Sequence, residues 1–175
     1  MKQTSVVIMI LMCVFSISFS GLGATSTSVN STGVSSSNFQ VMKQTGTQIK
    51  LHFSTPQLEV NPGTKTGYSS LKMAGAENTA EEGYPSLPVF STWVAIPARG
   101  DFNIRVSSSS PVLKGNITPE PAFATEEQAR LFTVNEAAYR SSANYPVNSF
   151  EHGSAQIIRD FRVVQLNLFP VQYQA

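Results

Sequence analysis

Residues 157–173 read IIRDFRVVQLNLFPVQY, and this stretch gives the strongest indication of the fold. It is rich in β-branched and aromatic residues and contains no glycine, which is typical of a half-buried β-strand. One face of such a strand carries three aliphatic residues, Val164, Leu166 and Leu168. The apolar set then shifts by one residue, to Phe169, Val171 and Tyr173. Pro170 lies at the shift and cannot donate a ladder hydrogen bond, so a bulge or bend is predicted there.

Further short strands are predicted upstream, where apolar and β-branched residues lie between turn residues. These runs are residues 39–44, 48–54, 57–60, 68–73, 90–96 and 102–106. The last run has the clearest alternation, with Asn103 and Arg105 between its apolar residues. Residues 74–82 are small and polar and predict a loop. Many short strands with proline and glycine turns predict an all-β fold, an antiparallel β-sandwich of jelly-roll type.

The connection between residues 119 and 153 contains few strand signals. Thr125-Glu126-Glu127-Gln128 matches a capping box, which predicts a short helix running toward Arg130. A second helical turn is predicted within residues 135–140. A connection this long in a compact domain is usually functional or disordered, so it is the first place to look for a site.

The N-terminus predicts export. Residues 1–24 have the anatomy of a secretory signal peptide, with the positive Lys2, an apolar part at 6–19 and small residues at 21–24. A membrane anchor, or a lipid attached to Cys13, is the alternative. Residues 25–38 are rich in Ser and Thr and predict a flexible linker, because they offer little apolar surface to bury. The expected division is therefore leader 1–24, linker 25–38 and one domain, 39–175.

The composition disfavours several functions. Twelve basic and eleven acidic residues leave a net charge of +1, without the basic patch that a nucleic-acid partner requires. The one cysteine, Cys13, lies in the predicted leader, so we expect neither a disulfide nor a cysteine nucleophile in the secreted chain. His52 and His152 are far apart and are expected to face solvent. No catalytic, cofactor-binding or metal-binding residue is predicted, since no metal cluster or G-x-S-x-G motif is present.

Two further features have a structural interpretation. Trp93 could line a ligand surface, but burial statistics favour a place in the sandwich core. The sequence Arg159-Asp160-Phe161-Arg162 is expected to form an ion pair within the domain and to begin a strand.

Two blocks carry a family resemblance. Residues 83–90, GYPSLPVF, with VAIP at 94–97, and residues 158–173, IRDFRVVQLNLFPVQY, resemble recurrent blocks of the N-terminal propeptide of gingipain-type (family C25) cysteine peptidases. They occur in the family's order, and the resemblance spans residues 39–173. It implies a β-sandwich that helps a separate catalytic domain to fold and keeps it latent during export through the periplasm to the cell surface or medium. The family's propeptide continues past the second block with a further strand, so residues 39–175 are expected to be a propeptide truncated at its C-terminus.

The resemblance also implies how latency could arise. In arginine-specific members a loop arginine is thought to occupy the specificity pocket of the catalytic domain, where a guanidinium can pair with a carboxylate through two hydrogen bonds. The candidates in this sequence are Arg140 and Arg130, both within residues 119–153. Arg140 is the better placed because small polar residues follow it. The alternative for each is an ordinary surface arginine.

Two other functions are compatible with the sequence. One is a stand-alone secreted β-sandwich that serves as a binding or adhesion module of a bacterial cell surface. The other is a propeptide-like domain on a surface protein exported by the same route. The expected partner of the favoured function is the cognate cysteine peptidase domain, with no membrane attachment after cleavage of the leader.

Overall fold

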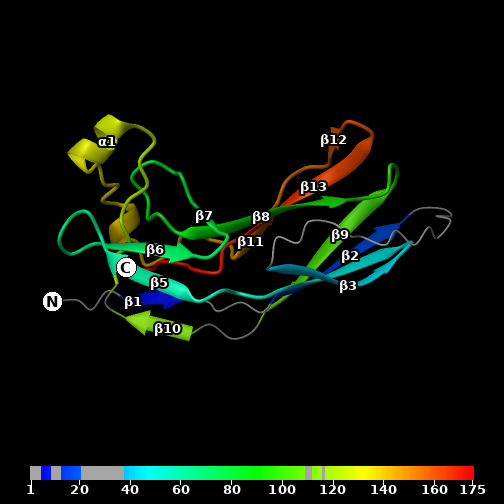
Figure 1. The fold of residues 1–175 in the computed structure, drawn as a ribbon, viewed down its shortest axis with the longest axis horizontal. Helices are drawn as coiled ribbons and strands as arrows, with labels where there is room; N and C mark the ends of the chain where they lie inside the picture. Colours follow the sequence, from blue (N-terminus) through cyan, green and yellow to red (C-terminus); the bar gives the residue numbers. More distant parts are fainter. Residues whose placement is uncertain (1–4, 9–12, 21–37, 109–111, 116) are drawn as a thin grey trace.

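The computed structural model describes residues 5–8, 13–20, 38–108, 112–115 and 117–175. The described chain folds mainly into antiparallel strands, and Figure 1 shows an elongated molecule. The predicted all-β, antiparallel fold class is therefore confirmed. Within the described part of the chain, no helix is long and apolar enough to cross a membrane.

The larger sheet has β13 and β8 at its centre. Its strands lie in the order β11 (Phe150–His152), β13 (Phe161–Leu168), β8 (Pro88–Ala95) and β7 (Glu77–Asn78), and β12 (Gln156–Ile158) also pairs with β13. The central register runs from Val163 opposite Ala95 to Leu168 opposite Phe90. The beginning of β8 and the end of β13 therefore lie side by side.

The second sheet has four strands in the order β3 (Phe39–Thr45), β4 (Gln48–Phe53), β2 (Cys13–Ser20) and β9 (Asp101–Ser107). Two further pairs complete the strands: β5 (Leu58–Pro62) with β6 (Ser69–Met73), and β1 (Ser5–Ile8) with β10 (Val112–Gly115). The short helices are α1 (Glu126–Leu131) and η1 (Ala138–Arg140).

The two main sheets share one core. Phe53 of β4 packs edge-on against Phe90 of β8, with ring centroids 4.9 Å apart, and both side chains are buried. Leu51, Val164 and Leu166 lie in the same buried cluster. Burial of large apolar side chains between two sheets is the main favourable term in such a sandwich.

Most of the predicted elements are confirmed. The strands expected at 39–44, 48–54, 57–60, 68–73, 90–96 and 102–106 form, with bounds shifted by one or two residues. The helix α1 begins at the predicted capping box, in which Thr125 and Gln128 cap each other's backbone, and η1 forms within 135–140. Residues 74–82 were predicted to form a loop, but β7 forms within them and pairs with the beginning of β8.

The closing stretch differs from expectation at its end. Val164, Leu166 and Leu168 are buried as predicted, and β13 ends just before Pro170. Beyond it, however, Gln172 is buried as well as its apolar neighbours. Its Nε2 donates to the carbonyl oxygen of Pro146 at 2.7 Å. The segment is therefore inserted into the domain rather than half exposed.

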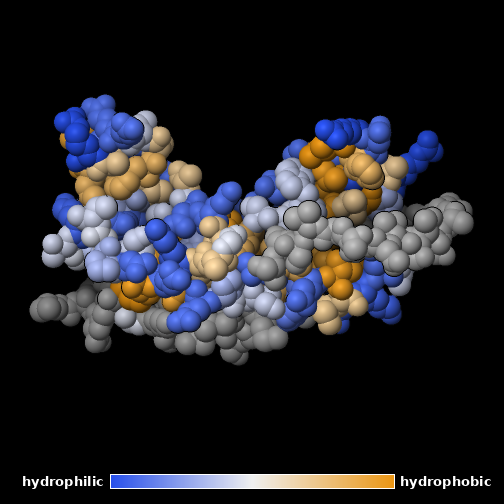
Figure 2. Space-filling view, viewed as in Figure 1, coloured by the Kyte–Doolittle hydropathy of each residue, from blue (hydrophilic) through white to orange (hydrophobic). Residues whose placement is uncertain are grey.

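One structural interpretation of the sequence was wrong, and a second was wrong in part. Trp93 lies opposite Gln165 and remains 45% exposed, so it is not part of the core. Arg162 makes no ion pair in the described part of the chain; its Nη1 donates to the carbonyl oxygens of Pro97 at 3.0 Å and Gly100 at 2.8 Å. These bonds brace the β8–β9 turn against β13, which begins at Phe161 as predicted. Beside this brace lies an exposed apolar area over β12 and β13 (Figure 2).

The predicted leader contributes strands to the uncleaved chain. Residues 5–8 form β1 and residues 13–20 form β2, while the rest of the leader and residues 25–37 of the linker lie outside the described residues. The division into leader, linker and domain stays a prediction.

Truncation of Phe53 tests the shared core. The fully buried ring of Phe53 fills the space between the sheets, so Phe53→Ala should lower the free energy of unfolding by about 3–5 kcal/mol. Phe161→Ala is the matched control, since that ring is 65% exposed, and should cost less than about 1 kcal/mol. Urea denaturation followed by fluorescence measures both, and equal losses would contradict the packing described here.

Candidate inhibitory segment

We call residues 119–153 the inhibitory segment, because both predicted arginines lie in it. Its first part is held by backbone hydrogen bonds to the loop before β8. The N–H of Gly83 donates to the oxygen of Ala122 at 2.9 Å, and the N–H of Ala122 donates to the oxygen of Tyr84 at 2.8 Å. The N–H of Asn135 donates to the oxygen of Gly83 at 2.9 Å. The segment is thus fixed although it contains few strand residues.

Gly83 is the residue on which this contact depends. Its φ is +73°, in the left-handed region that favours glycine. A Cβ atom at this position would lie 2.9 Å from the backbone nitrogen of Asn135. Any side chain would therefore strain the local backbone and push the segment away.

The last part of the inhibitory segment is held by the end of the closing stretch. Tyr173 and Tyr145 exchange two backbone hydrogen bonds, of 2.7 and 2.8 Å. The N–H of Ala175 donates to the oxygen of Ser141 at 3.1 Å. The two blocks that carry the family resemblance therefore hold the segment from both sides.

An aromatic cluster fixes the middle of the segment. The ring of Tyr139 lies 6.0 Å from that of Tyr68 and 5.5 Å from that of Tyr173, measured between centroids. Its hydroxyl donates to the oxygen of Pro119 at 2.9 Å. Burial, and secondarily the neighbouring Tyr68, raises the pKa of Tyr139 well above its ordinary value of about 10. The hydroxyl is therefore neutral at physiological pH.

The helix α1 is held mainly at its end. None of its own residues is buried, but the following Phe132 packs against Tyr68 and Phe123, with ring centroids 4.8 and 5.6 Å away. The Nζ of Lys65 lies 4.8 Å above the same ring, an arrangement that favours a cation–π interaction.

The two predicted arginines are both exposed. Arg140 ends η1, directly between the anchored Tyr139 and Ser141, and its side chain is 78% exposed. It pairs with the carboxylate of Glu136 at 2.8 Å. Arg130 lies in the last turn of α1 and makes no ion pair in the described part of the chain. No contact joins the two arginines among the described residues, and the inhibitory role of either stays a prediction.

Sequence reasoning missed Glu136, although its signal is readable. Glu136 precedes Arg140 by four residues, the spacing at which opposite charges meet on a helical turn. The contact between Gly83 and Asn135 left no such signal, because it joins residues far apart in the chain.

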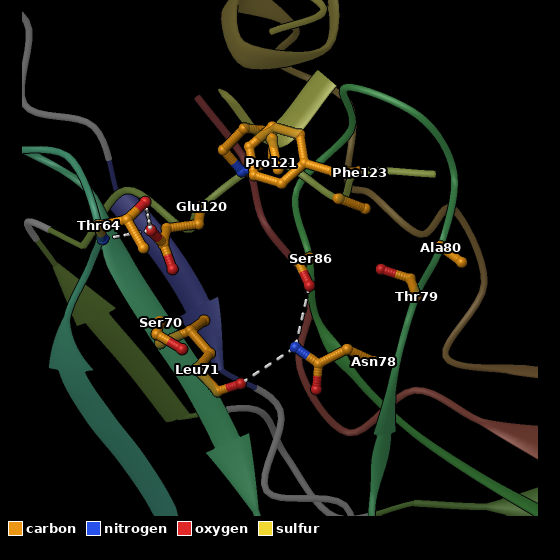
Figure 3. A pocket seen from close by; sticks show the side chains of 12 residues that line it. Thr64, Ser70, Leu71, Asn78, Thr79, Ala80, Ser86, Glu120, Pro121 and Phe123 are labelled. Atoms are coloured by element: carbon orange, nitrogen blue, oxygen red, sulfur yellow. Dashed lines mark hydrogen bonds between the residues drawn. The ribbon is translucent and has the colours of Figure 1, made fainter. Parts of the chain in front are cut away.

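A pocket of about 540 Å³ lies between the beginning of the inhibitory segment and the residues around β7 (Figure 3). The carboxylate of Glu120 accepts hydrogen bonds there from the N–H and the hydroxyl of Thr64. The Nδ2 of Asn78 donates to the oxygens of Leu71 and Ser86 at 3.2 and 3.0 Å. The lining residues include neither His nor Cys, so the hydroxyls in the pocket have no imidazole or thiolate beside them.

The histidines do not contribute to a site either. His52 is half-buried in β4, and His152 is exposed in β11, with its Nδ1 3.0 Å from the oxygen of Gly153. Among the described residues, no three metal-ligating side chains lie together. What the segment does present to solvent is the guanidinium of Arg140, on a backbone held at both neighbouring residues.

Comparisons with known proteins agree with this geometry. Residues 30–175 match the protein family Propeptide_C25. The chain is similar to the structure described as a complex of Porphyromonas gingivalis RgpB pro- and mature domains, with a TM-score of 0.69 and 19% identity over 78% of this chain and 75% of that chain. It is also similar to a structure on zymogenic latency of gingipain K from Porphyromonas gingivalis, with a TM-score of 0.58 and 20% identity over 78% and 81% of the two chains. No curated protein matches the chain.

Substitution of Gly83 tests the anchoring of the segment. Gly83→Ala should lower the free energy of unfolding by about 2–3 kcal/mol, because it adds a backbone clash to the strain of a positive φ. Gly67→Ala is the control: its φ is +91°, but no atom lies within 4 Å of the added Cβ, so about 1 kcal/mol is expected. If urea denaturation shows equal losses of unfolding free energy for the two variants, the close approach of Gly83 to Asn135 does not contribute to stability.

High pH should loosen the same segment. Since the pKa of Tyr139 is raised in the folded chain, the neutral hydroxyl contributes stability that is complete below pH 10 and declines as the pH rises above it. Tyr139→Phe should be less stable at pH 8 by about 1 kcal/mol, because a hydrogen bond is lost. Its stability should then fall less steeply between about pH 9.5 and 11.5 than that of the natural chain. Parallel pH profiles would contradict this role of Tyr139.

Proposed function

Since the chain belongs to the C25 propeptide family, we propose that it is the N-terminal propeptide of a secreted C25-type cysteine endopeptidase. In this function it contributes no catalytic residue. It helps the catalytic domain to fold, and it keeps that domain latent until the propeptide is removed. The comparisons favour this function over a stand-alone binding module.

The expected partner is the cognate catalytic domain. The two similar structures are, by their own descriptions, a complex of pro- and mature domains and a study of zymogenic latency. The predicted leader adds export through the periplasm to the cell surface or medium. Together these features support a precursor that is exported in an inactive form.

The presentation of Arg140 supports inhibition through this residue. Its neighbours are fixed on both sides, by the half-buried ring of Tyr139 and by the hydrogen bond between Ala175 and Ser141. The guanidinium nevertheless extends into solvent. Because the backbone around Arg140 is already ordered, binding costs little backbone entropy and only the arginine side chain has to be immobilised, which favours association.

The ion pair with Glu136 is not an obstacle to this role. Both side chains are largely exposed, and such pairs contribute only about 0.3–0.5 kcal/mol. A carboxylate at the bottom of a water-excluding pocket would accept two hydrogen bonds from the guanidinium and interact more strongly. Arg140 can therefore exchange Glu136 for a pocket carboxylate.

The inhibition constant against the catalytic domain of an arginine-specific C25 peptidase tests this proposal. Arg140→Ala should weaken inhibition by roughly tenfold or more, which corresponds to about 1.4 kcal/mol. Arg140→Lys should have an inhibition constant between those of the natural chain and Arg140→Ala, because an ammonium group keeps the charge but cannot form two parallel hydrogen bonds with a carboxylate. Glu136→Gln should change inhibition by no more than about twofold, since the exposed pair is weak.

Arg130→Ala is the matched control and should leave inhibition unchanged. If Arg140→Ala inhibits as well as the natural chain, Arg140 has no role in the specificity pocket. A large loss with Arg130→Ala alone would assign that role to Arg130.

A further inference from the structure

The pocket beside the inhibitory segment opens where one residue, Glu120, bridges two parts of the fold. The N–H of Glu120 donates to the oxygen of Ser69, at the beginning of β6, at 2.9 Å. Its oxygen accepts from the N–H of Ser86, in the loop before β8, at 2.7 Å. The pocket of about 540 Å³ lies between these two parts, and Asn78 spans it through its bonds to Leu71 and Ser86 (Figure 3).

The carboxylate of Glu120 is held in a fixed position at this pocket. Its Oε1 accepts hydrogen bonds from the N–H of Thr64 and from the hydroxyl of the same residue, the latter at 2.7 Å. Its stem lies against Gly63, where a Cβ atom would come within 2.9 Å of the Cγ and Cδ of Glu120. The second oxygen, Oε2, forms no hydrogen bond within the described part of the chain, and Figure 3 shows it on the side of Ser70.

The charge of the pocket is negative. Of the described residues that line it, Glu120 alone has an ionisable side chain. Lys65 follows Thr64, but its Nζ lies over the ring of Phe132, and no ion pair with Glu120 forms among the described residues. A carboxylate that lacks a cationic partner favours a positively charged ligand, because charge-assisted hydrogen bonds are the strong ones.

The contacts of Glu120 favour one kind of cation. A guanidinium binds a carboxylate best through both oxygens, and Thr64 already occupies one of them. A calcium ion takes six or more oxygen ligands, and no three metal-ligating side chains lie together in the described ranges. An ammonium group is a compact charge with three donors, for which Oε2 of Glu120 and the hydroxyl of Ser70 are suitable acceptors.

The other side of the pocket is apolar. The rings of Pro121 and Phe123 lie together above the carboxylate in Figure 3, and the methyl groups of Ala80 and Ala129 also line the pocket. Such a surface can be covered by an alkyl chain whose charged end lies at the carboxylate, as lysine side chains cover apolar surface elsewhere. The pocket therefore matches a ligand with one charged end and an apolar stem.

We propose that this pocket binds a primary ammonium group on an unbranched alkyl chain, as carried by a lysine side chain of another polypeptide or by a small free amine. Glu120 receives the ammonium, and Pro121 and Phe123 cover the alkyl chain. This binding activity goes beyond the proposed function, which uses the exposed guanidinium of Arg140. A few converging polar groups beside apolar walls are typical of small-ligand sites.

Titration of the full chain with Nα-acetyl-lysine amide, followed by NMR, tests the pocket. The amide signals of Thr64, Ser70 and Ala122 should shift and saturate, with a dissociation constant of roughly 1 mM, as expected of so small a ligand. The norleucine derivative has the same alkyl chain without the ammonium and should bind at least about tenfold more weakly. The arginine derivative should also bind more weakly than the lysine derivative.

Substitution of Glu120 tests the role of the carboxylate. Glu120→Gln keeps an oxygen that accepts from Thr64, so the fold should be retained, but the lysine derivative should bind at least about tenfold more weakly. Glu59→Gln is the matched control, because that exposed residue of β5 does not line the pocket, and should change binding by less than about twofold. If Glu120→Gln does not fold, the lysine and norleucine derivatives on the natural chain decide.

A titration with n-butylamine distinguishes the two sources of the ligand. This amine has the alkyl chain and ammonium of a lysine side chain without the peptide groups. If it binds within about threefold of the lysine derivative, or more tightly, small free amines are the ligands. If the lysine derivative binds more than about threefold more tightly, the site recognises lysine within a polypeptide. Either result supports the pocket.

Four outcomes overturn the proposal. They are the absence of saturable shifts at the pocket, equal binding of the norleucine derivative, tighter binding of the arginine derivative, and unchanged binding by a folded Glu120→Gln variant. None of these readouts involves the peptidase, so they are independent of the inhibition measured for Arg140→Ala.

Discussion

The close backbone approach of Gly83 to Asn135 is the constraint on which the presentation of Arg140 depends. The inhibitory segment has little regular structure of its own, so hydrogen bonds from the rest of the domain must offset the conformational entropy that is lost when the segment is ordered. The loop at Gly83 supplies them on one side, and Tyr173 supplies them on the other. A side chain at position 83 would separate the segment from this support.

The larger sheet explains why both anchors lie at the same place. The first family block leads into β8, and the second contains β13 and the residues that follow it. Because β8 and β13 are antiparallel neighbours, with Phe90 opposite Leu168, the beginning of one and the end of the other meet at one end of the sheet. Two blocks about eighty residues apart thus form one support, and the sandwich core keeps that support rigid.

Local patterns predicted the local structure, and tertiary contacts account for most of the errors. Alternation identified β4 and β9, and the capping box located α1, because each depends on residues close in sequence. Gln172 is a polar residue, but its side chain finds a carbonyl partner inside the domain and is buried. Trp93 is a large aromatic residue, yet it lies on an exposed sheet face, and the sequence does not show which face of the strand is exposed. The apolar run at residues 6–19 fits an export leader and a central strand equally well, because both select the same side chains.

The brace formed by Arg162 has a consequence for the medium in which the domain works. Both of its acceptors are main-chain carbonyl oxygens rather than a carboxylate. Such oxygens are not protonated in acidic solution and carry no net charge for dissolved salt to screen. The β8–β9 turn and the antiparallel pair β12–β13 should therefore keep their mutual position in acidic or saline surroundings, where an ion pair with a carboxylate would weaken.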